Sequence, residues 1–193
     1  IRLSLVGSEM CIRDSLSGAT LGIVGLGRIG QAVAKRASGF DMRILANSRN
    51  LSDEQAWEHN ATRVELSTLL RESDFVSLHI PLSPETRHLI NRETLAQMKR
   101  NAILINTTRG GTVDQLALYE ALRDGIIAGA ALDVTDPEPI PLDDPLLTLP
   151  NALIVPHIGS ATVKTRNKMA LMAAENLIAG VKGRLLPNEV KVK

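Results

Sequence analysis

The chain of 193 residues is poor in the residue types on which several classes of protein depend. A single cysteine, Cys11, excludes an internal disulfide framework and a zinc site built from several thiolates. Aromatic residues make up only 2% of the sequence and the net charge is +1, so neither base stacking nor a basic surface favours nucleic-acid binding. No apolar run approaches the ~20 residues that a membrane-spanning helix needs. These absences favour a cytoplasmic protein with no membrane or nucleic-acid partner.

Residues 1–15, IRLSLVGSEMCIRDS, show no helix or strand periodicity and lack the apolar segment and cleavage site of a signal peptide. They resemble a translated library-adapter sequence, and we therefore expect this segment to be foreign to the protein. The alternative is a native N-terminal arm with little regular structure. The fold prediction accordingly begins at Leu16 and leaves Cys11 aside.

What the sequence does contain is a glycine pattern, GLGRIG at residues 25–30, between a short apolar segment and a helical one. Gly25 allows a sharp turn, Gly27 allows a pyrophosphate to approach the backbone, and Gly30 allows the helix to pack close to the strand. The N–H groups at the start of that helix would then face the anion. A strand, turn and helix in this order predict a dinucleotide-binding site, and the alternative is a purely structural glycine turn.

From Leu16 onward, short apolar segments alternate with helical patterns. Strands are expected at residues 20–24, 42–46, 61–66, 75–80, 102–106, 126–132 and 152–155. Helices are expected at residues 30–37, 67–72, 92–99, 114–124 and 162–181, with a further helix start at 52–54. Short apolar strands alternating with helices predict a parallel sheet that is covered on both faces.

The predicted fold class is therefore α/β, a Rossmann-type doubly wound parallel sheet with a long C-terminal helix. The dinucleotide-binding domain is expected at residues 16–160, and the helix and tail at 161–193. Ligands of such sheets bind beyond the carboxyl ends of the strands. The residues at these positions are Asn47-Ser48-Arg49, His79-Ile80-Pro81, Thr107-Thr108-Arg109, Asp133 and His157. The histidines lack the clustering of metal ligands, and no metal site is predicted.

The end of the second strand indicates which dinucleotide is bound. NAD-binding proteins usually carry Asp or Glu there, because a carboxylate accepts a hydrogen bond from the ribose 2′-hydroxyl. This chain has Asn47, Ser48 and Arg49 instead, and an arginine binds a 2′-phosphate through charge-assisted hydrogen bonds. The sequence therefore favours NADPH over NADH. The alternative is that Arg49 is a solvated turn residue.

Three side chains offer the chemistry of carbonyl reduction. Arg109, which precedes two glycines, suits bidentate binding of the carboxylate and carbonyl of a 2-oxo acid. His157 could donate a proton to the carbonyl oxygen while hydride reaches the carbon. Glu138 is the candidate carboxylate that would keep His157 protonated near neutral pH. The structural alternatives are an ordinary salt bridge for Arg109 and a hydrogen-bonded core histidine for His157.

Four motifs in a fixed order, GLGRIG, INTTRGG, ALDVTDPEP and PHIGSAT, resemble those of the D-isomer-specific 2-hydroxyacid dehydrogenases. The resemblance covers nearly everything from Leu16 to the end of the chain. Within that family the sequence is most similar to the glyoxylate/hydroxypyruvate reductases of animals, through residues 132–151, 156–169 and 173–183. It implies a homodimeric enzyme that uses NADPH to reduce glyoxylate or hydroxypyruvate to the 2-hydroxy acid.

The resemblance also implies roles for individual residues. Arg109 would bind the substrate and polarise its carbonyl, His157 would be the acid/base, and Glu138 its partner. Ser160 would line the substrate pocket with Arg109 and His157. Contacts along the cofactor are implied for Gly25, Gly27, Arg28, Ile29, Gly30, Ser48, Arg49, Pro81, Thr107, Asp133 and Gly159. Among these, Arg49 would hold the 2′-phosphate and Asp133 the nicotinamide amide.

Members of this family carry a further substrate-binding domain of ~100 residues, a common domain size, ahead of the dinucleotide-binding domain. This sequence does not contain it, so we expect a fragment that binds cofactor but reduces substrate poorly. The final helix would normally pack on that domain. Its apolar side chains are therefore expected to be partly exposed, at Met169, Leu171, Met172, Leu177 and Ile178.

Two other functions remain open from the sequence. Transcriptional corepressors that share this fold sense NAD(H), and NAD-linked 2-hydroxyacid dehydrogenases, such as those acting on phosphoglycerate, take other substrates. Arg49, where these proteins carry an acidic residue, argues against both. The choice of 2-oxo acid would depend largely on the domain that this sequence does not contain.

Overall fold

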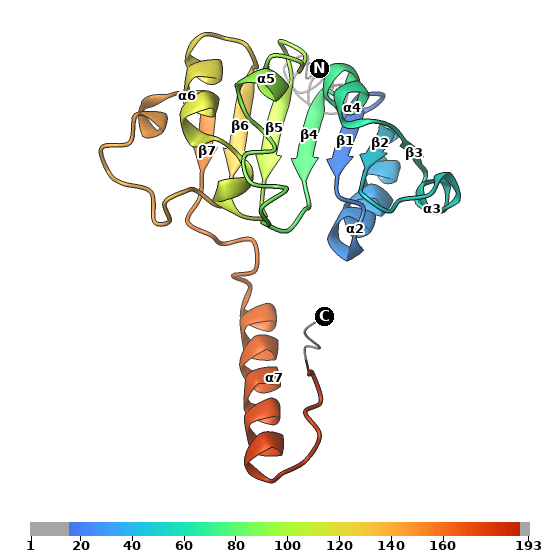
Figure 1. Cartoon of the computed structure of the whole chain (residues 1–193), viewed down its shortest axis with the longest axis vertical. Helices are drawn as coiled ribbons and strands as arrows, with labels where there is room; N and C mark the ends of the chain where they lie inside the picture. The colour runs from blue at the N-terminus through green and yellow to red at the C-terminus, as the bar shows by residue number, and fades with distance from the viewer. Residues whose placement is uncertain (1–15, 190–193) are drawn as a thin grey trace, which may run out of the picture. The chain divides into compact units, whose positions relative to one another are not determined.

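The computed structural model describes residues 16–189, which form a seven-stranded sheet and a long C-terminal helix (Figure 1). The strands are β1 (Thr20–Val24), β2 (Arg43–Asn47), β3 (Ala61–Arg63), β4 (Phe75–Leu78), β5 (Ile103–Asn106), β6 (Gly129–Leu132) and β7 (Ala152–Ile154). They lie in the order β3-β2-β1-β4-β5-β6-β7, and every neighbouring pair is parallel. The predicted doubly wound α/β fold is confirmed. The segment expected to be foreign, residues 1–15, lies outside the described residues.

The connections between strands carry short helices. They are α2 (Arg28–Ala37), α3 (Asp53–Trp57), α4 (Leu66–Glu72), α5 (Arg92–Leu95) and α6 (Gln115–Arg123), with 3-10 turns at Ser38–Phe40, Gly110–Thr112 and Pro145–Thr148. The chain divides into two compact units after Pro156. The sheet belongs to the first unit, and the long helix α7 (Val163–Val181) belongs to the second.

One face of the sheet packs against α2 and α3. The residues that meet there are alternate side chains of β1 and β2 and small side chains of the two helices: Leu21, Ile23, Ile44, Ala46, Ala34, Ala37 and Ala56. Small residues on the helices let them lie close to the strands. This close packing fixes the position of the turn between β1 and α2, which is the predicted glycine loop.

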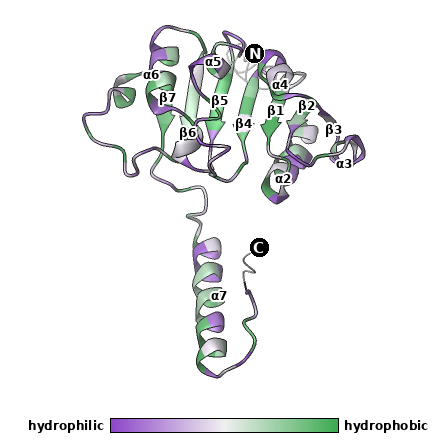
Figure 2. Ribbon diagram, viewed as in Figure 1, coloured by the Kyte–Doolittle hydropathy of each residue, from purple (hydrophilic) through white to green (hydrophobic). Residues whose placement is uncertain are grey.

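The opposite face packs against α4, α5 and α6 in a larger cluster. Its main members are Val24, Leu45, Val76, Leu78, Leu104, Leu69, Leu70, Leu95, Leu118 and Leu122. Successive side chains of a strand point to opposite faces, so Leu45 joins this cluster while Ile44 and Ala46 join the other. Figure 2 shows the central strands mostly in green or pale colours, whereas the helices and loops carry much of the purple.

The face that carries α2 and α3 is less completely covered over β4–β7. Among the described residues, Phe75, Ile103, Ile105 and Ala131 are half-buried on that face, and Leu153 is 63% exposed. The cover predicted for both faces is thus complete over β1 and β2 and partial over the other half of the sheet.

Most elements begin and end within a few residues of the predicted positions, and the two largest differences have local causes. The strand expected at 61–66 ends at Arg63 because Glu65 is already the N-cap position of α4, whose first residue is Leu66. The helix expected at 92–99 ends at Leu95 because the next N–H groups, of Gln97 and Met98, bond three residues back rather than four.

The second unit consists mainly of α7. Thr162 caps this helix by accepting a hydrogen bond from the Thr165 N–H at 3.2 Å. Four of the five apolar side chains expected to be partly exposed are clearly so: Met169 is 54%, Leu171 64%, Leu177 69% and Ile178 53% exposed. The fifth, Met172, is half-buried. A helix with so much exposed apolar surface is typical of an interaction surface.

Asp74 ties together the amino ends of three strands. Its carboxylate accepts hydrogen bonds from the Thr20 N–H at 2.9 Å and from Lys99 Nζ at 2.8 Å, and its carbonyl accepts one from the Ile103 N–H at 3.0 Å. Partial burial alone would raise the pKa of Asp74. The hydrogen bonds from Lys99 and Thr20 outweigh that effect and lower the pKa below its usual value.

We expect this carboxylate to make the stability of the chain depend on acid pH. Because the folded pKa is lowered, the stabilisation is fully present above the unfolded pKa of about 3.9 and is lost as the pH falls through the folded value. Asp74→Asn should lower the melting temperature at neutral pH and reduce its dependence on pH below about 5. Thermal unfolding followed by circular dichroism measures both. Asp143→Asn, at an exposed loop aspartate, is the control, and equal behaviour of the two variants would contradict the expectation.

Candidate functional site

The glycine loop, residues 25–30, joins the carboxyl end of β1 to α2. Gly25 has φ +100°, and a Cβ atom there would lie 2.7 Å from the carbonyl oxygen of His79. A Cβ atom at Gly30 would lie 2.2 Å from the carbonyl oxygen of Gly25. Larger residues at either position would therefore displace backbone.

Gly27 differs from the other two glycines because it faces open space. No described atom lies within 4 Å of the position that its Cβ would take. Gly27 is also the N-cap of α2, and no described side chain caps that end of the helix or places an acidic group in its first turn. The exposed N–H groups and the positive end of the ten-residue helix thus form a site for an anion.

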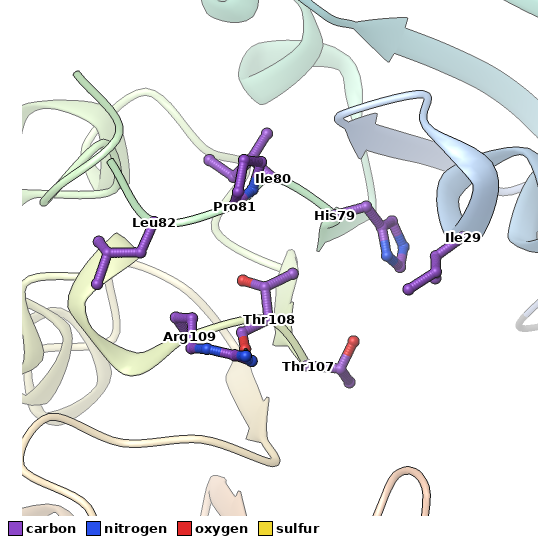
Figure 3. Close-up of a pocket in the computed structure, with 8 residues that line it drawn as sticks. All are labelled: Ile29, His79, Ile80, Pro81, Leu82, Thr107, Thr108 and Arg109. Atoms are coloured by element: carbon purple, nitrogen blue, oxygen red, sulfur yellow. The ribbon is translucent and has the colours of Figure 1, made fainter. Parts of the chain in front are cut away.

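A cleft of about 470 Å³ opens beside the glycine loop, at the carboxyl ends of the strands. Figure 3 shows Ile29 and His79 at one end of it and Leu82 and Arg109 toward the other. The residues that line it are Ile29, His79, Ile80, Pro81, Leu82, Thr107, Thr108 and Arg109. Four predicted site residues, Ile29, Pro81, Thr107 and Arg109, are thus brought together from three different strand ends.

The turn that carries Arg109 is held by a buried amide. Asn106, at the end of β5, is only 1% exposed, and its Nδ2 donates to the Arg109 carbonyl at 3.0 Å. Its Oδ1 accepts from the N–H and the hydroxyl of Thr108, at 3.0 and 2.8 Å. The buried Thr112 hydroxyl donates to the same Arg109 carbonyl at 2.8 Å. Arg109 itself is exposed at the cleft, and its Nη1 donates to the Thr108 carbonyl at 2.6 Å.

His79 lines the cleft; the strand-end rule placed it with Ile80 and Pro81 at this edge, but no individual role was predicted for it. Its Nε2 lies 3.0 Å from Oγ of Ser77, two residues earlier in β4. Burial lowers the pKa of His79 below its usual value, so the imidazole is neutral at physiological pH. The signal that could have identified it is its position directly after β4, which is shared with Pro81.

A second cavity, of about 240 Å³, lies at the end of β2. Its lining is mostly polar: Leu26, Gln31, Ser48, Asn50, Leu51, Gln55, Glu58 and His59. Arg49 is strongly exposed beside it, and its Nη2 lies 3.8 Å from Oε2 of Glu85. Asn47 has a structural role, because its Nδ2 donates to the Val64 carbonyl at 2.9 Å.

Asp133 and Glu138 follow β6, and neither is among the described residues that line the cleft. Asp133 is buried, and its N–H donates to the Asn106 carbonyl at 2.9 Å, so it lies beside the Arg109 turn. Glu138 is exposed in the loop that follows, where the Thr135 hydroxyl donates to the Pro137 carbonyl at 2.8 Å.

His157, Gly159 and Ser160 belong to the second unit. His157 is exposed and has φ 52°, a left-handed conformation that is uncommon for a residue other than glycine. Strained residues of this kind occur preferentially at functional sites. The approach of His157 to Glu138 and Arg109 stays a prediction.

Within residues 16–189, no helix has the length and apolar character needed to cross a bilayer. The same range contains no group of three or more His, Cys, Asp or Glu side chains arranged to hold a metal ion.

The sequence profile of the D-isomer specific 2-hydroxyacid dehydrogenase, NAD binding domain, matches residues 6–159. The chain belongs to this family. The matched domain of this dehydrogenase family binds a nicotinamide dinucleotide. The glycine loop, the open backbone at Gly27 and the cleft beside them are consistent with that function.

Several dehydrogenases of known name are similar to the chain. It is 57% identical to a glyoxylate reductase of Korarchaeum cryptofilum over 94% of this chain and 54% of that protein. It is 50% identical to the glyoxylate reductase/hydroxypyruvate reductase of Mus musculus over 92% of this chain and 54% of that protein. A glyoxylate reductase from Paecilomyes thermophila superposes with a TM-score of 0.79 at 42% identity, over 89% of this chain and 52% of that one. The chain spans about half the length of these relatives.

Two glycine substitutions test the structure of the loop in this dehydrogenase domain. Gly30→Ala should lower the free energy of unfolding by about 1–3 kcal/mol, because the new methyl group meets the Gly25 carbonyl. Gly27→Ala, in open space, should cost less than about 1 kcal/mol. Urea titration of both variants measures the difference. Equal destabilisation would contradict the packing described for α2.

Proposed function

We propose that the chain is the dinucleotide-binding part of an NADPH-dependent reductase that converts a small 2-oxo acid, glyoxylate or hydroxypyruvate, into the 2-hydroxy acid. The observation that carries the proposal is the cleft, which joins the glycine loop to the exposed guanidinium of Arg109. A dinucleotide on the loop and a carboxylate on the arginine would then lie side by side. The names of the similar proteins, glyoxylate and hydroxypyruvate reductases, support this substrate class.

The cofactor would be held by residues from several loops. The pyrophosphate would lie on the N–H groups of Gly27, Arg28 and Ile29, at the uncapped end of α2. Ser48 and Arg49 would hold the 2′-phosphate at the end of β2. Pro81, Thr107, Asp133 and Gly159 would contact the nicotinamide half. When bound, the cofactor supplies the hydride for the carbonyl carbon.

The remaining groups act on the substrate. Arg109 would bind the carboxylate and polarise the carbonyl, and the buried Asn106 and Thr112 fix the backbone from which its side chain starts. His157 would protonate the carbonyl oxygen, and Glu138 would keep the imidazole charged until that step. Ser160 would line the same pocket.

The proposal extends to the parts of the protein that this chain does not contain. The exposed apolar side chains of α7 would be covered by a substrate-binding domain, and the complete enzyme would be a homodimer. The substrate would be chosen mainly by that further domain. A reductase is favoured over an NAD(H)-sensing corepressor because Arg49 occupies the region where NAD-binding proteins carry a carboxylate.

Arg49 decides between the two cofactors. Arg49→Ala should weaken NADPH binding about tenfold or more, because it removes a charge-assisted bond to the phosphate, and should leave NADH binding within about twofold. Isothermal titration calorimetry with each nucleotide measures both effects. Arg36→Ala, at an exposed arginine of α2, is the matched control. Equal binding of NADH and NADPH by the unchanged chain would contradict the cofactor assignment.

The acid/base assignment is tested in the full-length protein. His157→Asn should lower kcat for glyoxylate reduction by about 10²–10⁴-fold while NADPH still binds. Glu138→Gln should lower kcat as well, because a neutral amide cannot pair with the charged imidazole. Steady-state rates give both results. An unchanged kcat in Glu138→Gln would remove Glu138 from the mechanism.

A further inference from the structure

The order of the strands brings two loops to either side of the glycine loop. β1 lies between β2 and β4 in the sheet, and all three strands run in the same direction. The loop after β2 carries Arg49, and the loop after β4 carries Glu85. A dinucleotide on the glycine loop would therefore lie close to both loops.

An ion pair already joins these two loops. Nη2 of Arg49 lies 3.8 Å from Oε2 of Glu85, and their side chains are 71% and 63% exposed. The loop after β4 thus brings a carboxylate to the guanidinium of Arg49. NAD-binding proteins place their carboxylate on β2, where this chain has Asn47.

Glu85 is held in place by its own turn. The Ser83 hydroxyl donates to Glu85 Oε2 at 2.6 Å, and the Ser83 N–H donates to Thr86 Oγ1 at 2.8 Å. The Thr86 hydroxyl donates to the Pro81 carbonyl at 2.7 Å, which connects the turn to the lining of the cleft. Hydrogen bonds from Ser83 and the backbone, together with the charge of Arg49, lower the pKa of Glu85 below its usual value. The carboxylate is therefore charged at the neutral pH at which a dinucleotide would bind.

We propose that Glu85 is a specificity-determining residue, which reduces the preference for NADPH by competing with the 2′-phosphate for the guanidinium of Arg49. The inference rests on the proposed function, in which Arg49 binds that phosphate. Both anions use the same donors, so NADPH must displace the carboxylate or share the guanidinium with it. NADH has no 2′-phosphate and does not make this exchange.

The size of the effect follows from the exposure of the pair. Exposed ion pairs are weak, so the change in a dissociation constant should be no more than about fivefold. Glu85→Gln keeps the shape of the side chain and removes its charge. It should tighten NADPH binding by about two- to fivefold and leave the dissociation constant of NADH unchanged.

A double-mutant cycle on the 193-residue chain tests this mechanism. Dissociation constants for NADPH and NADH are measured by calorimetry at low ionic strength for the unchanged chain, Glu85→Gln, Arg49→Ala and the double variant. Glu93→Gln, at an exposed glutamate of α5, controls for the loss of one negative charge. The gain in NADPH affinity from Glu85→Gln should disappear when Arg49 is already alanine, because the guanidinium for which the carboxylate and the phosphate compete is then absent.

Three results would overturn the inference: no gain in NADPH binding by Glu85→Gln, an equal gain for NADH, or a gain that persists in the double variant. The last of these would indicate direct repulsion of the phosphate rather than competition.

The Arg49→Ala variant distinguishes a failure of this inference from a failure of the proposed cofactor assignment. If Arg49→Ala leaves NADPH binding unchanged, the NADPH assignment is wrong and the inference about Glu85 is wrong as well. If Arg49→Ala weakens NADPH binding and Glu85→Gln has no effect, the inference alone fails.

Discussion

The close approach of α2 to the end of β1 is the constraint on which the rest of the site depends. A methyl group at Gly30 would lie 2.2 Å from the Gly25 carbonyl, so the helix can start where it does only with glycine at that position. The approach aims the N-terminus of α2 along the carboxyl ends of the strands. Gly25 in turn lies close to the His79 carbonyl, so the glycine loop contacts the residue that follows β4. The cleft residues Ile80 and Pro81 and the turn of Glu85 follow from that end of the strand.

A second constraint is the buried amide of Asn106. An unpaired polar group in that position would cost about 1–3 kcal/mol, but each of its atoms has partners in the turn that follows β5. Such satisfied networks favour a single backbone conformation. The turn therefore presents Arg109 at the cleft while leaving its guanidinium exposed to a ligand. The Asp133 N–H donates to the Asn106 carbonyl, so the end of β6 is fixed by the same residue.

The fold could be predicted from the sequence because each short apolar segment forms a strand. Each glycine of residues 25–30 is also explained by the local geometry: Gly25 and Gly30 by close approaches of the backbone, and Gly27 by the open space beside it. The rule that ligands bind at carboxyl ends of strands selected Pro81, Thr107 and Arg109, which line the cleft. Asn106 and Glu85 could not be identified in this way. The role of Asn106 depends on hydrogen bonds inside a turn, and that of Glu85 depends on β1 lying between β2 and β4. Neither the turn geometry nor the strand order can be read from one strand at a time.

The division of the chain after Pro156 has a consequence for the proposed reaction. The groups that would hold the dinucleotide, apart from Gly159, lie in the first unit, on loops fixed by a parallel sheet. The proposed proton donor, His157, lies in the second unit, whose long helix exposes apolar side chains over much of its length. In the proposed reaction the first unit would supply the cofactor contacts apart from Gly159, and the second unit would supply the proton donor. Cofactor binding would therefore depend mainly on the fold of the sheet, whereas reduction would depend on residues of both units.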